Sequence, residues 1–186
     1  INISTAAGNA SITGLVSNST ANNAVQVSAT AGSILDANPA QKDIDVGNGG
    51  FQLSAMGNIG EFAVESNFMD VVSTTGNITL REEASTSVLR LQTPGTATIY
   101  TGLQFSVDQA APLTVNNLYV DAGTDFRIAD SGVTVSGDLT VIADTIRGDA
   151  GTVGSGTLAT PVVMSAANAD ITLRDGTLAR YWNTSF

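Results

Sequence analysis

The sequence predicts an all-β fold, a β-solenoid of roughly seven to nine short coils. Three observations lead to this prediction. Apolar–polar–apolar triplets recur along the chain, Gly–Asn and similar pairs separate them, and no stretch of a dozen residues carries the apolar stripe of a helix. The polar residues are mostly Ser, Thr, Asn and Gly, which compete with their own backbone for hydrogen bonds and so favour turns and strands over helices.

The triplets are predicted to be the strands of the coils. Alternation places every second side chain on one face of a strand, and turn residues bound each triplet. Each triplet is too short for an ordinary hairpin strand, as a solenoid coil requires. They are Ile1–Ile3, Val25–Val27, Ile44–Val46, Phe51–Leu53, Phe62–Val64, Ile78–Leu80, Leu89–Leu91, Leu103–Val107, Leu113–Val115, Leu118–Val120, Phe126–Ile128, Val133–Val135, Leu139–Val141 and Ile171–Leu173.

Coil corners are predicted where Gly, or another small residue, is followed by Asn, Asp or Ser. Glycine permits φ > 0 at a corner, and the Asn or Asp side chain can bond backbone there as a cap or polar ladder. The spacing of roughly 19 to 28 residues is that of stacked repeats, and coils about 4.8 Å apart give a rod on the order of 35 to 40 Å long. The predicted corner residues are Gly32, Gly57, Asn58, Gly76, Asn77, Gly137 and Asp138.

No linker divides the chain, so residues 1–186 are expected to form a single solenoid domain, a segment of a longer exported chain. Residues 36–50 and 148–161 break the rhythm and are predicted to be loops. Ile1 begins at once in strand pattern, so an earlier coil or another subunit is expected to cover it. The rival fold is an antiparallel β-sandwich, which requires longer strands at a spacing of about 8 to 12 residues.

Composition argues against several classes of function. Seventeen Asp and Glu residues stand against seven Lys and Arg, a net charge of −10, which argues against binding to nucleic acid or to an anionic membrane. No apolar run is long enough to predict a membrane insertion. The chain has no Cys and therefore no thiol nucleophile. It also has no His, the residue that most often serves as a general base or as a ligand of a transition metal. We therefore expect no cofactor and no enzymatic activity.

Four residues of the first predicted loop form a candidate calcium site. Asp36, Asp43, Asp45 and Asn48 supply hard oxygen ligands in a Gly-rich loop, the type that Ca²⁺ prefers, although the EF-hand spacing is missing. Asp43 and Asp45 lie two apart and are expected to share a strand face, which also makes them the candidate carboxylate pair of a glycosidase. No aromatic cluster accompanies them, so solvated loop acids are the simpler interpretation.

Several stretches share a Gly–Asn/Ser–Ile theme, namely Ala31–Asn38, Gly57–Gly60 and Gly76–Glu82. They resemble the repeats of very large bacterial exported proteins of the filamentous-haemagglutinin type. The resemblance covers residues 1–145 in style and is clearest over residues 31–91. It implies a right-handed parallel β-helix, export to the cell surface and a role in adhesion or as a fibrous spacer. The N-terminal secretion region of that family is not recognisable here, and no ligand-binding residue is carried over.

The function expected from the sequence is that of a non-catalytic, extracellular, structural or adhesive segment of a bacterial surface or fibre protein. Stacked coils form a stiff rod, and exposed faces make weak, multivalent contacts. The expected partners are neighbouring coils or subunits and cell-surface glycans, with no nucleic acid and no membrane insertion. Two alternatives are a self-polymerising fibre subunit and a carbohydrate-active β-helix enzyme.

Overall fold

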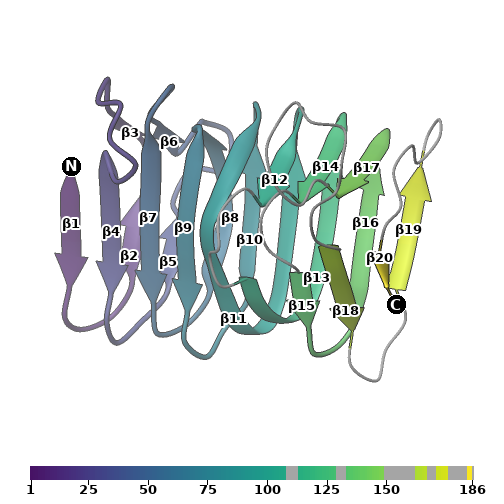
Figure 1. The fold of residues 1–186 in the computed structure, drawn as a ribbon. Coiled ribbons are helices and arrows are strands. Elements are labelled where there is room, and N and C mark those ends of the chain that lie inside the picture. The colour runs from purple at the N-terminus through teal and green to yellow at the C-terminus, as the bar shows by residue number, and fades with distance from the viewer. Residues whose placement is uncertain (108–112, 129–132, 149–161, 167–170, 176–183, 186) are drawn as a thin grey trace.

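The computed structural model describes residues 1–107, 113–128, 133–148, 162–166, 171–175 and 184–185, and these contain twenty strands and no helix. Figure 1 shows the strands stacked side by side along one axis, as the coils of a solenoid. Every strand pairing among the described residues is parallel. The predicted β-solenoid is therefore confirmed as a parallel β-helix, and the antiparallel sandwich is excluded.

Two long columns of strands run the length of the rod. The first stacks β1 (Asn2–Thr5), β4 (Val25–Ala29), β7 (Gly50–Ala55), β9 (Phe68–Ser73), the first parts of β11 (Thr86–Thr101) and β13 (Leu113–Ala122), β15 (Val133–Val135), β18 (Val162–Ala166) and β20 (Thr184–Ser185). The second stacks β2 (Ala10–Ile12), β5 (Ile34–Asp36), β8 (Ile59–Glu65), β10 (Ile78–Glu82), the later parts of β11 and β13, β16 (Leu139–Ala143) and β19 (Ile171–Asp175).

A third side of the coils is shorter. It pairs β3 (Leu15–Val16), β6 (Ile44–Asp45) and the end of β8, and further along the rod the start of β11, β12 (Phe105–Val107), β14 (Asp125–Ile128) and β17 (Thr145–Gly148). The first predicted loop, residues 36–50, contains β6 on this side. Of the second predicted loop, residues 149–161 lie outside the described residues, and Gly148 ends β17.

The length of a coil varies along the rod. Asn2 pairs with Gln26, Val25 with Phe51 and Phe51 with Met69, so successive offsets are 24, 26 and 18 residues. The seven strands from β1 to β15 in the first column mark about six turns, and β18 and β20 continue the column beyond them. Strands β15 to β20 extend the same columns, while the segments that connect several of them lie outside the described residues.

The core is one continuous hydrophobic interior that successive coils bury for one another. Inward residues of one column lie in register from coil to coil, and the fully buried side chains include four phenylalanines. Phe105 and Phe126 are register partners, and their rings stack with centroids 5.7 Å apart and planes 9° from parallel. Because each layer shields the next, a single coil has no core of its own.

The corners between the two long columns carry a ladder of hydrogen bonds. The Asn58 Oδ1 atom accepts from the Asn77 backbone N–H at 2.8 Å, and Asn77 Oδ1 in turn accepts from the Thr96 N–H at 2.8 Å. One coil's side chain thus satisfies the backbone donor of the next coil. The residues of this corner ladder are Asn9, Ser33, Asn58, Asn77, Thr96, Asn117 and Asp138.

The corner glycines are required for space and not for a left-handed backbone. Among the described residues positive φ occurs only at Gly8, Gly14 and Gly47, so the expectation of φ > 0 at Gly32, Gly57, Gly76 and Gly137 is wrong. A Cβ atom on Gly76 would lie 2.5 Å from both N and Oδ1 of Asn58, and one on Gly137 would lie 2.2 Å from Oδ1 of Asn117. Glycine therefore makes room for the ladder residue of the preceding coil.

We predict that Gly76→Ala lowers the free energy of unfolding by about 1 to 3 kcal/mol, because the new methyl group overpacks against Asn58. Gly60→Ala is the matched control. Its Cβ would meet only ordinary contacts, the nearest at 3.5 Å from the Ile34 carbonyl oxygen, and its φ is not positive. Urea unfolding of both variants checks the prediction, and equal stability of the two variants would contradict it.

Candidate functional site

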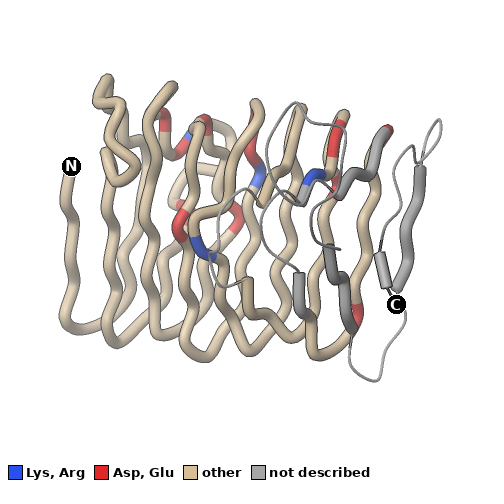
Figure 2. Tube along the Cα trace, in the orientation of Figure 1, with Lys and Arg blue, Asp and Glu red and all other residues tan. Residues whose placement is uncertain are grey.

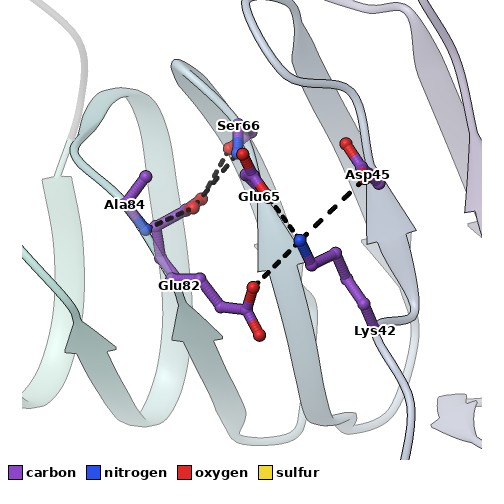
Figure 3. A network of polar contacts seen from close by, with 7 residues as sticks. Lys42, Asp45, Glu65, Ser66, Glu82 and Ala84 are labelled. Atoms are coloured by element: carbon purple, nitrogen blue, oxygen red, sulfur yellow. Dashed lines mark hydrogen bonds and ion pairs between the residues drawn. The ribbon is translucent and has the colours of Figure 1, made fainter.

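Among the described residues, charged residues are sparse and gather in a few places, one of them on the third side near β6 and β8 (Figure 2). There Lys42 is surrounded by carboxylates from three successive coils. Its Nζ atom lies 2.9 Å from Glu83 Oε2 and 3.9 Å from Asp45 Oδ2, and it donates a hydrogen bond to Glu65 Oε2 (Figure 3). The hydrogen bonds to Glu65 and Glu83 raise the pKa of Lys42, so the ammonium stays charged and links the three layers.

A buried carboxyl group, that of Glu82, lies beside this cluster. Glu82 is 1% exposed, and its Oε1 accepts from the backbone N–H groups of Ser66 at 3.1 Å and Ala84 at 3.2 Å. The Ser66 hydroxyl donates to Oε2 at 2.7 Å (Figure 3). Burial raises the pKa of Glu82 to about 7, although the three donors lower it in part. Glu82 therefore binds its proton in the range of neutral pH.

A second buried carboxyl group belongs to Asp43, which is 1% exposed. Its Oδ2 accepts from the Ala63 N–H at 2.9 Å, and its Oδ1 has no hydrogen-bond partner among the described residues. Burial raises the pKa of Asp43 to about 6; the Ala63 amide lowers it, and the neighbouring Asp36 carboxyl raises it again. Asp36 itself accepts a hydrogen bond from the Asn38 N–H at 2.6 Å.

The four residues of the predicted calcium site are not brought together as one ligand set. Asp43 is buried, Asp45 faces Lys42, and Asn48 is exposed, with its backbone carbonyl accepting from the Asn67 amide at 3.3 Å. In the part of the chain that the structure describes, no three acidic side chains are placed to hold a metal ion. The cation beside the Asp45 carboxylate is the Lys42 ammonium group, at the place where the calcium hypothesis expected a metal ion.

The expectation that Asp43 and Asp45 share a strand face is also wrong. Strand β6 contains only Ile44 and Asp45, so Asp43 lies before the strand, and its side chain is buried. Asp45 remains half-exposed beside Lys42. A glycosidase needs two carboxyl groups that flank one bond, whereas here the Asp43 carboxyl is buried and the Asp45 carboxylate faces Lys42.

The outer face of the first column carries a chain of polar side chains that sequence reasoning missed. Gln26 Nε2 donates to Gln52 Oε1 at 2.9 Å, and Gln52 Nε2 donates to Asp70 Oδ2 at 2.9 Å. Arg90 then donates from Nε to Asp70 Oδ1 at 2.7 Å and from a terminal nitrogen to Oδ2 at 3.1 Å. Each of these residues lies between two apolar residues of a strand, which is a signal that the sequence does contain.

The outer face of the second column brings together aromatic residues that the sequence separates. Tyr100 and Tyr119 lie in neighbouring coils with ring centroids 5.9 Å apart and planes tilted by 56°. The guanidinium carbon of Arg81 lies 4.8 Å from the Tyr100 ring centroid, and Glu61 pairs with Arg81 at 3.2 Å. The Tyr100 ring thus contacts both Tyr119 and Arg81, and the three side chains form a row along the rod.

Strand β11 bends from the first column into the second (Figure 1). A groove lies at this corner. It has a volume of about 530 Å³, within the range of small-ligand sites. Its walls come from β9, β11, β13 and the turn after β15, and no charged residue lines it. A second cavity of about 280 Å³ lies near Phe68, Thr86 and Arg127 on the third side.

Within the described residues no helix is long and apolar enough to cross a membrane. Comparisons of the chain with protein-family models, with curated proteins and with solved structures find no match.

Proposed function

We propose that the chain is a non-catalytic structural segment of an exported bacterial surface or fibre protein, a stiff spacer whose outer faces make adhesive contacts. The observation that carries the proposal is the unbroken stacking of parallel coils. Backbone pairing and the shared core join successive layers, and the corner ladder and the polar chain from Gln26 to Arg90 add side-chain hydrogen bonds between several of them. Such a rod holds its outer faces at fixed positions along one axis.

The acidic residues fit this role better than catalysis. The surface carboxylates near β6 form ion pairs with Lys42, and Glu82 and Asp43 are buried. In this arrangement they make hydrogen bonds and ion pairs between layers and do not present a pair of acids to a substrate. The low charge content and the Thr-, Ser- and Asn-rich surface suit weak contacts repeated over many copies.

Surface labelling of the source cells tests the proposal. Antibodies raised against the purified chain are expected to label intact cells or the culture medium, and protease treatment of intact cells should remove the cell-bound signal. Labelling that requires permeabilisation would contradict export. The same purified chain should scatter X-rays as an elongated rod; a globular scattering profile would contradict the spacer role.

A further inference from the structure

We propose that the groove at the β11 corner is a binding site for a neutral oligosaccharide. This inference rests on the adhesive part of the proposed function and names its site and ligand class. The groove is lined by Val72, Ser73, Thr74, Gln92, Thr93, Pro94, Thr114, Val115, Asn116 and Ser136, and so spans four successive coils.

The groove owes its shape to an irregularity in the sheet. Thr93 pairs with Val115 and Thr96 with Asn117, so Pro94 and Gly95 on β11 stand opposite the single residue Asn116 on β13. Such a bulge bends a strand and re-aims its side chains, and bulges are enriched beside functional sites. Thr93 is held in place because its hydroxyl donates to the Gly76 carbonyl and accepts from the Gly95 N–H at 3.1 Å.

Five polar side chains of the groove are available for a ligand. No hydrogen bond of the side-chain amides of Gln92 and Asn116 is found among the described residues, nor of the hydroxyls of Thr74, Thr114 and Ser136. Amides and hydroxyls both donate and accept, as the hydroxyl groups of a sugar require.

Charge selects the ligand. All ten lining residues are uncharged, and the chain as a whole carries a net charge of −10, so an acidic sugar finds no cation in the groove and is repelled by the rest of the surface. Val72 and Pro94 supply apolar patches for the C–H faces of sugar rings. No aromatic ring lines the groove, so we expect a dissociation constant on the order of 1 mM, which becomes useful through repetition along a fibre.

Amide chemical shifts of the ¹⁵N-labelled chain test the inference. Maltotriose, cellotriose and N-acetylchitotriose are titrated separately, with trigalacturonate as the acidic counterpart. At least one neutral trisaccharide is expected to shift the amides of the groove, while trigalacturonate leaves them unchanged. Gln92→Ala and Asn116→Ala should each weaken binding at least tenfold, whereas Gln26→Ala, on the same face but outside the groove, should not.

Three results would overturn the inference. They are the absence of any shift with all three neutral sugars, shifts that map to the cavity near Arg127 instead, and equal weakening by Gln26→Ala. Circular dichroism of each variant shows whether a loss of binding reflects loss of fold, and the Gln92→Asn variant, which keeps a shorter amide, should bind better than Gln92→Ala. Failure of binding leaves the surface-labelling result intact, so the two proposals are separable.

Discussion

Replacing Phe105 by alanine is expected to lower the free energy of unfolding by about 3 to 5 kcal/mol. Phe105 is fully buried, and its ring stacks on that of Phe126 in the next coil. The substitution removes this stacking contact and leaves a cavity between two layers that share one core. Because each coil is stabilised mainly by its neighbours, the loss at one layer weakens the coupling of the layers on either side.

Urea-induced unfolding, followed by circular dichroism, measures this effect. Leu103→Ala is the matched control, since Leu103 lies two residues earlier and is 49% exposed; its removal should change stability by no more than about 0.5 kcal/mol. If Phe105→Ala and Leu103→Ala unfold at the same urea concentration, the stacked core does not hold the coils together as described.

The Glu82→Gln variant is expected to remove most of the pH dependence of stability between pH 5 and 8. Burial raises the pKa of Glu82 from 4.5 in the reference state to about 7 in the fold. The folded protein therefore binds this proton more tightly than the unfolded chain, so its contribution is complete below about pH 4.5 and is lost as the pH rises through 7. The loss is on the order of 3 kcal/mol.

Glutamine preserves the geometry around this position. Its carbonyl oxygen can accept from the Ser66 and Ala84 N–H groups, and its amide can donate to the Ser66 hydroxyl, where Glu82 now accepts. The variant should be more stable than the parent at pH 8 and about equal to it at pH 5. Denaturant unfolding at a series of pH values measures this difference.

The exposed Glu61→Gln variant is the control, because Glu61 pairs with Arg81 at the surface and its replacement should leave the slope unchanged. A parental slope in Glu82→Gln would show that this carboxyl is not the group that titrates. Asp43 acts in the same direction, since its pKa is also raised, to about 6, so a smaller slope at lower pH should persist in Glu82→Gln.

The strand pattern and the positions of the corners could be predicted from the sequence, because both depend on residues that are adjacent in the chain. Alternation within a triplet decides which side chains enter the core, and Asn58 and Asn77 carry their ladder role beside the glycines that precede them. The steric reason why these positions require glycine could not be predicted. A side chain at position 76 would collide with Asn58, eighteen residues earlier in the chain. This contact exists only once the coils are stacked.

The side-chain clusters between coils were not predictable for the same reason. Coil offsets range from 18 to 26 residues at the start of the rod, so the vertical neighbour of a residue cannot be found by a fixed count. Gln52 meets Gln26 and Asp70, and Lys42 meets Glu65 and Glu83, only through the register. The calcium hypothesis considered the acids of one loop and missed the lysine placed among acids from three layers.

The unequal coil lengths have a consequence for how such a molecule can diversify. The second coil is eight residues longer than the third, yet Val25, Phe51 and Met69 still stand directly above one another. The additional residues are accommodated at the third side, around β6, without displacing the two long columns. Insertions there can change what the molecule displays to its surroundings while the two long columns keep their register.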